Sequence, residues 1–190
     1  MNKKKLVTMV ASLAMVAVIG VGATLAYMSD TTDKKTNTFT VGKVEASLVE
    51  KTNGDKEWDD TTDGKNMYPG QIVEKKPIMT IAAGSADCYA FLQVTGADAL
   101  VAAGFTMDTF SSDWEKTFTG NTLDGIYVYK DKVVKAEMAT ALPAIFTQVT
   151  YDADNGNGVT STVGTVNVAG CAVQAEGLTQ DGALAQATFK

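Results

Sequence analysis

The chain has 190 residues, including 16 lysines, 22 acidic residues and two cysteines, and it contains neither histidine nor arginine. The missing histidine excludes Ser-His-Asp triads, Cys-His nucleophiles and histidine-ligated zinc sites. A net charge of -6, with a pI near 4.6, is untypical of proteins that bind nucleic acids. We therefore expect a protein that is not an enzyme, needs no cofactor and has no nucleic-acid partner.

The first 26 residues have the three parts of a secretory signal peptide. Three lysines precede an uncharged apolar run from Leu6 to Ile19, and Thr24 and Ala26 then occupy the small-residue positions that a signal peptidase reads. This pattern predicts cleavage between Ala26 and Tyr27 and a secreted mature protein. The alternative is an uncleaved anchor, because the uncharged stretch of 22 residues that ends at Tyr27 matches a bilayer core of about 30 Å.

Removal of the leader leaves 164 residues with a net charge of -9, because 13 lysines then face 22 acidic residues. A domain of this size buries roughly 70% of its unfolded surface and needs neither a metal nor a disulfide to fold. Residues 27–38 contain no apolar side chain after Met28, so alone they cannot bury enough surface to become ordered. The predicted organisation is a signal peptide at 1–26, a flexible arm at 27–38 and one domain at 39–190.

Alternating apolar residues begin at Phe39 and change phase at Gly42, which indicates a β-bulge. A charged loop follows, with turn signals at Asn53-Gly54 and Asp63-Gly64. Runs of β-branched and aromatic residues then predict further strands at 72–82, 88–95, 123–131, 144–151 and 163–175.

Two short segments, 98–105 and 179–188, read as helices with Asp98 and Thr179 as their N-caps. Strands and helices do not alternate regularly along the chain. The sequence therefore predicts an all-β fold, an antiparallel β-sandwich with short helical insertions.

Four motifs in a fixed order carry a family resemblance that spans residues 20–178. The first is GATLAYMSDTTDKKTNTFTVGKVEASL, in which a leader ending in T-x-A is followed by an aromatic residue, a polar spacer and N-T-F-x-x-G. The others are YPGQ at 68–71, DCYAFLQV at 87–94 and CAVQAEGL at 171–178. Together they resemble the TasA/camelysin-like family of exported bacterial proteins, which are processed by a SipW-type signal peptidase.

The resemblance implies a jelly-roll-like β-sandwich on the surface, or in the biofilm matrix, of a Gram-positive bacterium. It also implies assembly into fibres, in which the N-terminal segment of one subunit completes the sheet of the next. The arm, with Tyr27, Met28, Asn37 and Thr38, is then the candidate donor strand, because an extended peptide can satisfy an open sheet edge. The alternative is a disordered tether without a partner.

The expected partners are the protein itself, related fibre proteins and the SipW-type peptidase during export, with membrane contact only through the uncleaved leader. Two other functions compete with the structural one. The first is a camelysin-like surface protease or protease-associated protein, and the second is a monomeric adhesion or carbohydrate-binding module. Without histidine, the nearest nucleophile and base are Ser85 with Lys75 or Lys76, which lie on either side of a predicted strand.

Cys88 and Cys171 stand where the resembling proteins carry a small apolar and an aromatic residue, respectively. Two such departures in a secreted chain predict one disulfide, which would contribute on the order of 4 kcal/mol. The alternative is a pair of buried free thiols.

Asp152 and Asp154 begin a stretch that resembles a calcium-binding EF-hand loop, but the fifth, sixth and twelfth positions hold Gly156, Asn157 and Val163. A tight turn explains this composition as well, so we predict no metal site and regard both aspartates as weak candidates.

Tyr127 and Tyr129 share one face of a strand. They would form either an exposed carbohydrate-binding stripe or, as we expect, part of the packing between sheets.

Overall fold

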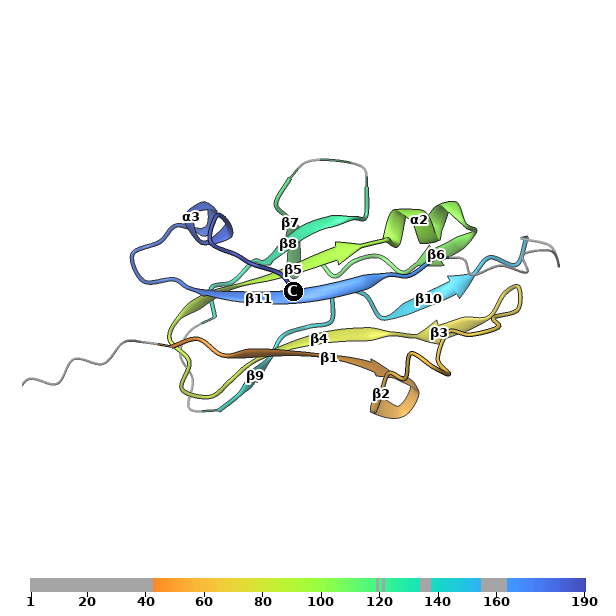
Figure 1. Ribbon diagram of the computed structural model, residues 1–190, viewed down its shortest axis with the longest axis horizontal. Coiled ribbons are helices and arrows are strands. Elements are labelled where there is room, and N and C mark those ends of the chain that lie inside the picture. Colours follow the sequence, from red (N-terminus) through yellow and green to blue (C-terminus); the bar gives the residue numbers. More distant parts are fainter. Residues whose placement is uncertain (1–42, 119, 121, 134–137, 155–163) are drawn as a thin grey trace, which may run out of the picture. The chain divides into compact units, whose positions relative to one another are not determined.

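Antiparallel strands account for most of the regular structure of the chain (Figure 1). The computed structural model describes residues 43–118, 120, 122–133, 138–154 and 164–190, which belong to one unit at 41–190. The predicted leader, the arm and the bulge at Gly42 lie outside the described residues. The strands are β1 (Ala46–Thr52), β2 (Lys56–Glu57), β3 (Ile72–Glu74), β4 (Lys76–Ile81), β5 (Cys88–Thr95), β6 (Phe105–Met107), β7 (Trp114–Lys116), β8 (Gly125–Tyr129), β9 (Thr140–Ala141), β10 (Gln148–Tyr151) and β11 (Asn167–Gln174). The helices are the 3-10 turn η1 (Asn53–Asp55), α2 (Ala97–Ala102) and α3 (Gln180–Leu184).

The strands form two layers. The first layer contains the sheets β2-β1-β4-β9 and β3-β10-β6, which continue each other because β3 and β4 are parts of one segment interrupted only at Lys75. The second layer is the sheet β11-β5-β8-β7. All strand pairs in the described residues are antiparallel. This architecture confirms the predicted all-β antiparallel sandwich with short helices.

Strand β5 supplies side chains to two cores because it alternates strictly between its two faces. Cys88, Ala90, Leu92 and Val94 face the main core between the layers, where Met79, Ile145, Phe146 and Trp114 are also buried. Phe91 faces the opposite side and is buried with Val128 and Ala183 under α3 and the C-terminal segment. The second layer is therefore covered on both faces.

The long strands were predicted best. The segment 88–95 is a strand over its full predicted length, and 72–82 forms β3 and β4. The segments 123–131, 144–151 and 163–175 contain the strands β8, β10 and β11, each of which is shorter than its predicted segment. Strands β2, β6, β7 and β9 were missed, because two or three residues are too few to show an alternating pattern.

One of the two N-cap predictions is confirmed. Thr179 caps α3, and its hydroxyl accepts a hydrogen bond from the backbone N–H of Gly182 at 3.2 Å. The Asp98 prediction is wrong, because Asp98 lies inside α2, which begins at Ala97 after Gly96.

A distant aspartate binds the start of α2 instead. The carboxylate of Asp124 accepts hydrogen bonds from the N–H groups of Gly96, Ala97 and Asp98 at 3.1, 2.7 and 3.3 Å. In return, the carboxylate of Asp98 accepts from the N–H groups of Leu123 and Asp124 at 2.7 and 3.0 Å. Two aspartates thus bind each other's backbone and tie α2 to the start of β8.

Candidate functional site

Two edge strands, one from each layer, meet on the same side of the sandwich. Among the described strands, β11 pairs only with β5, while β1 pairs with β4 and, at its last two residues, with β2. The two edges approach each other closely, since a Cβ atom built on Gly170 lies 3.8 Å from the Cβ of Leu48. We call the surface between β1 and β11 the open side; both strands are seen in Figure 1.

One hydrogen bond shows which residues of β11 bond to β5 and which direct their backbone groups outward. The N–H of Ala175 donates to the carbonyl of Asp87 at 2.8 Å, and successive residues of an antiparallel strand bond to alternate sides. Residues 167, 169, 171 and 173 therefore bond to β5. The N–H and C=O groups of Val168, Gly170, Ala172 and Gln174 point away from it, and no described strand pairs with them.

The edge of β1 is shorter. Ala82 donates to the carbonyl of Glu45 at 2.8 Å, so the odd-numbered residues of β1 bond to β4. Ala46 and Leu48 direct their backbone groups outward, whereas the carbonyl of Glu50 already accepts from the N–H of Trp58 at 2.8 Å. The outer edge of β1 is thus occupied by the β2 hairpin at one end and unpaired, among the described residues, at the other.

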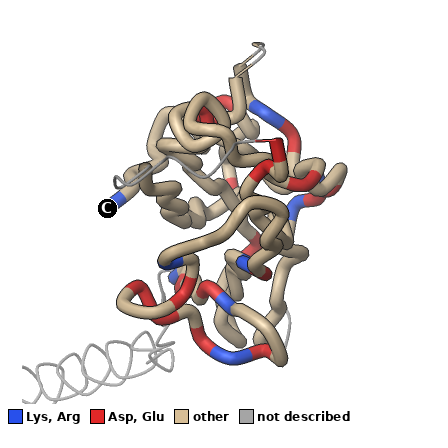
Figure 2. The backbone as a smooth tube through the Cα atoms, turned by 90° about the vertical axis from the view of Figure 1, so that its right-hand side faces the viewer, with Lys and Arg blue, Asp and Glu red and all other residues tan. Residues whose placement is uncertain are grey.

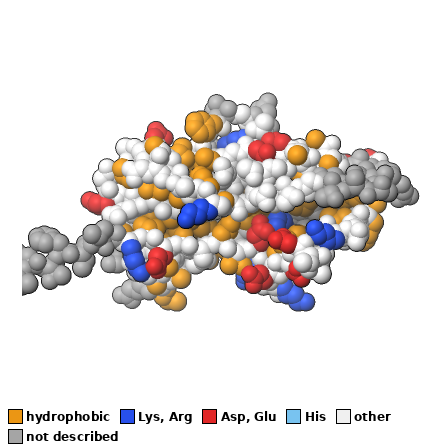
Figure 3. Space-filling view, viewed as in Figure 1, with side chains coloured by type: hydrophobic (Ala, Val, Ile, Leu, Met, Phe, Trp, Pro, Cys, Tyr) orange, Lys and Arg blue, Asp and Glu red, His pale blue; other side chains and the backbone are white. Residues whose placement is uncertain are grey.

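The side chains of β11 do nothing to discourage pairing. Its sequence, NVAGCAVQ, contains no charge and no proline, which are the usual means by which an edge strand avoids another strand. Charges of both signs are interspersed elsewhere along the described chain (Figure 2). Hydrophobic side chains form a band between the two layers on the face shown in Figure 3. The open side therefore combines unpaired backbone groups with apolar surface.

A groove of about 580 Å³ follows the second half of β11. Val44, Leu178 and two residues of the C-terminal segment line it together with β11. The residues that line it are Val44, Cys171, Ala172, Val173, Gln174, Glu176, Leu178, Gln186 and Thr188. This groove borders four residues of β11, of which Ala172 and Gln174 direct their backbone groups outward.

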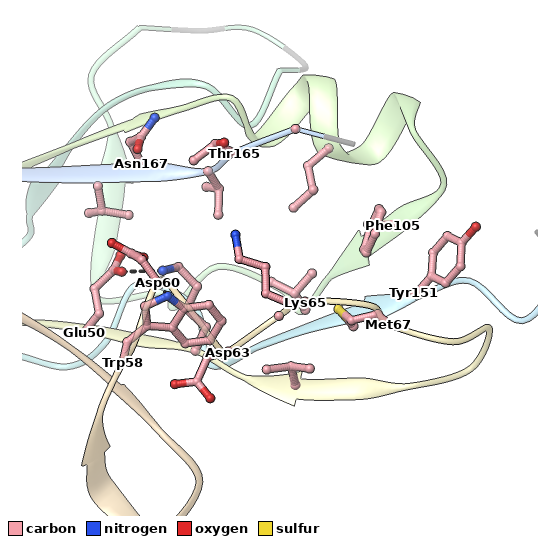
Figure 4. A pocket seen from close by; sticks show the side chains of 18 of the residues that line it. Glu50, Trp58, Asp60, Asp63, Lys65, Met67, Phe105, Tyr151, Thr165 and Asn167 are labelled. Carbon is pink, nitrogen blue, oxygen red and sulfur yellow. Dashed lines mark hydrogen bonds and ion pairs between the residues drawn. The ribbon is translucent and has the colours of Figure 1, made fainter. Parts of the chain in front are cut away.

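A larger cavity, of about 700 Å³, lies at the opposite end of the open side, where β11 begins and β1 ends (Figure 4). Lys75 occupies a core-facing position of the β3–β4 segment, and its side chain is only 6% exposed. Its ammonium group forms an ion pair with Glu50 and lies 4.1 Å from the centre of the Trp58 ring. The indole N–H of Trp58 in turn donates to Asp60 at 2.9 Å.

The two ends of this cavity differ in chemistry. Glu50, Trp58 and Asp60 gather at one end in Figure 4, and Phe105 and Tyr151 stand at the other. The rings of Phe105 and Tyr151 are 4.7 Å apart, and Val73 and Val149 contribute buried apolar surface. The cavity therefore suits an occupant with one charged and one aromatic part. Sequence reasoning missed it, and the one local signal was a lysine at a core position of an alternating strand.

The predicted disulfide is not formed. Cys88 and Cys171 are both free, and the register of β5 and β11 places Cys88 opposite Gln174 and Cys171 opposite Phe91. Cys88 faces the main core, whereas Phe91, and with it Cys171, faces the other side of the sheet. Burial, with a smaller contribution from the charge of Asp87, raises the pKa of Cys88 to about 11.

The tyrosines pack as expected. Tyr127 is 5% exposed in the main core and its hydroxyl donates to the carbonyl of Leu123 at 2.7 Å, while Tyr129 contacts Trp114 edge to face. Burial, followed by the charges of Asp98 and Asp124, raises the pKa of Tyr127 to about 12. This pair does not form an exposed stripe.

The remaining sequence candidates stay apart from one another. Ser85 and Lys75 lie beyond opposite ends of β4, and the Ser85 hydroxyl accepts from the N–H of Glu45 at 3.1 Å. Lys76, at the start of β4, forms an ion pair with Glu74.

Asp152 accepts a hydrogen bond from the N–H of Asp154 at 3.1 Å, as in a tight turn, and the rest of the predicted loop lies outside the described residues. No cluster of three or more potential metal ligands occurs in the described ranges.

Thr24, Ala26 and the arm residues Tyr27, Met28, Asn37 and Thr38 lie outside the described part of the chain. Within that part, no helix has the length and apolar character needed to cross a membrane. Comparisons with protein-family models, with curated proteins and with solved structures returned no match.

Proposed function

We propose that this chain is an exported structural protein of the cell surface or extracellular matrix, which assembles into fibres by strand addition at the open side. The observation that carries the proposal is the outer edge of β11, an eight-residue strand without charged residues, because no described strand pairs with that edge. The donor is the arm at 27–38 of another copy, which becomes a free end when the leader is removed.

Backbone pairing alone does not sustain such an assembly. Four outward-facing residues of β11 offer eight hydrogen bonds, each with a net value of about 1 kcal/mol. Ordering eight residues of a flexible arm costs a similar amount, since fixing one residue costs about 1–2 kcal/mol. Apolar side chains must therefore be buried as well, and Leu48, Val168 and Ala172, which pack against the main core, are only partly buried.

The length of the arm agrees with donation to a neighbour. Twelve extended residues span about 40 Å, whereas the eight residues of β11 span about 26 Å. An arm that covers the whole edge therefore keeps about four residues to connect the two copies. The same arm folded back onto its own domain would give a monomer, which is the competing outcome.

Electron microscopy and size analysis of the mature chain test the proposal. We expect filaments from residues 27–190 and soluble monomers from a variant that lacks residues 27–38. Normal filaments from the shortened chain would refute donation by the arm, and monomers from the intact mature chain would refute assembly itself.

A further inference from the structure

The mature N-terminus is the only part of the arm with large apolar side chains. Tyr27 and Met28 stand at its start, and all following residues up to Thr38 are polar. Predicted cleavage also gives Tyr27 a free α-ammonium group, a positive charge that the precursor lacks at this position. The first residue of the mature chain thus combines an aromatic ring with a cation.

The larger cavity on the open side has the complementary chemistry. Because Lys75 and Glu50 neutralise each other, the remaining charges that line it are Asp60, Asp63 and Lys65. Among the described residues, neither Asp60 nor Asp63 is in an ion pair. The lining of the cavity as a whole therefore has one carboxylate in excess, and the end opposite Glu50 and Asp60 presents aromatic rings.

We propose that this cavity binds the mature N-terminus of a neighbouring copy. The inference rests on the proposed function and on cleavage before Tyr27. The α-ammonium group of Tyr27 lies at the end formed by Glu50 and Asp60, and the phenol ring lies toward Phe105 and Tyr151. A volume of about 700 Å³ is within the usual range for sites that enclose a small ligand.

The position of the cavity sets the direction of the donor strand. The cavity is lined by Asn167 and Val168 at the start of β11, and the groove by Cys171 to Gln174 near its end. A strand whose first residue occupies the cavity therefore runs parallel to β11 and reaches the groove about four residues later. Lys65, which stands in the middle of the cavity in Figure 4, then faces the early part of the arm, where Asp30 supplies a counter-charge.

This arrangement makes assembly depend on cleavage. In the precursor, Tyr27 carries a neutral amide instead of an ammonium group, and the leader continues where the donor must end. The ion pair with Asp60 is then lost and the preceding residues need space inside the cavity.

A photocrosslinking experiment locates Tyr27 in assembled fibres. The mature chain carrying p-benzoylphenylalanine at position 27 is mixed with an equal amount of ¹⁵N-labelled chain, assembled, irradiated and mapped by mass spectrometry. We expect crosslinks between light and heavy copies at Met67 and Phe105. The same probe at position 32 serves as the control and should label the middle of β11. Crosslinks from position 27 that fall outside the cavity, or within one copy, overturn the proposal.

A second measurement tests the charge. Acetylation of the N-terminus, or the substitution Asp60→Asn, should raise the critical concentration for assembly about tenfold, the effect of one charge-assisted hydrogen bond. Glu115→Gln is the matched control, because it removes the same charge from the exposed face of β7 and should leave assembly unchanged. If deletion of 27–38 abolishes fibres but acetylation and Asp60→Asn do not weaken them, the docking site is refuted and strand donation stands.

Discussion

Two proline substitutions in the same strand should have opposite effects, because β11 bonds to β5 through every second residue. Ala172 directs its N–H away from β5, so Ala172→Pro removes no hydrogen bond from the isolated domain. Ala169 directs its N–H toward Gln93, so Ala169→Pro removes one ladder bond and leaves the Gln93 carbonyl without its partner. The two variants change the same residue type within one strand.

The magnitudes differ enough to be measured. An unsatisfied group costs about 1–3 kcal/mol, and the proline ring also collides with the neighbouring strand, so Ala169→Pro should lower the free energy of unfolding by at least 2 kcal/mol. Ala172→Pro should change it by less than about 1 kcal/mol, because the altered flexibility of the unfolded chain offsets part of any strain. Urea unfolding followed by circular dichroism measures both values.

Assembly gives the second readout. Ala172→Pro removes an N–H group that the donor strand would bind and places a ring in the groove, so the variant should fold normally but fail to form filaments. If both prolines lowered the free energy of unfolding equally, the assignment of Ala169 to the β5 side and of Ala172 to the outer side would be wrong. Normal filaments from a folded Ala172→Pro chain would show that β11 is not the acceptor edge.

Three further predictions concern the fold. In the native protein one thiol, that of Cys171, should react rapidly with Ellman's reagent at pH 8 and the buried Cys88 only after unfolding; two fast thiols would contradict the assigned faces of β5 and β11. Because the folded pKa values of Cys88 and Tyr127 are raised from 9.0 to about 11 and from 10.0 to about 12, stability should be fully present below pH 9 and decline from there toward pH 12. Urea midpoints between pH 7 and pH 11 measure this decline, and a constant midpoint would contradict it. Asp124→Ala should lower the free energy of unfolding by about 2 kcal/mol, since three N–H groups at the start of α2 lose their acceptor, whereas Asp131→Ala should have little effect.

The fold was predictable where the pattern of side chains is long. Eight residues of β5 alternate between two apolar faces, so both its limits and its burial could be read from the sequence. Proline at position 77 would argue against a central strand, yet Pro77 is buried in the middle of β4. Its nitrogen, which has no hydrogen to donate, faces the gap between β9 and β10, where Met79 and Lys75 bond to Leu142 and Thr147 on either side, so no ladder bond is lost.

The disulfide prediction failed because sequence does not determine register. Cys88 and Cys171 lie on adjacent strands, but they are three residues out of register in the antiparallel pair, which separates them and places them on opposite faces. A shift of two or four would have placed both on one face. The alternating pattern of side chains could place each cysteine in a strand, but it could not show which residue of the neighbouring strand lies opposite.

The candidate site was harder to predict because distant segments build it. Glu50, Trp58, Lys75 and Asn167 come from four separate parts of the chain, and only the folded sandwich places them around one cavity. The unpaired edge could not be predicted from the sequence either, since β11 and the central strand β5 are both uncharged and eight residues long. Strand order distinguishes an edge from a centre, and periodicity does not report strand order.

The edges of this sandwich are not protected equally. Strands β2, β6, β7 and β9 contain two or three residues each, and such short edges offer little backbone to another chain. In contrast, β11 is as long as the central strand beside it, and its sequence contains neither a charge nor a proline. A long uncharged edge is a hazard for a protein that must stay soluble, unless another strand covers it in the working state. In the proposed function the arm is that covering strand, and the leader would delay it until export, because cleavage would give the arm its free end. The proposed function thus joins the exposed edge and the released arm in one assembly step, and it predicts that a chain whose β11 edge is charged by Ala172→Lys stays monomeric after cleavage.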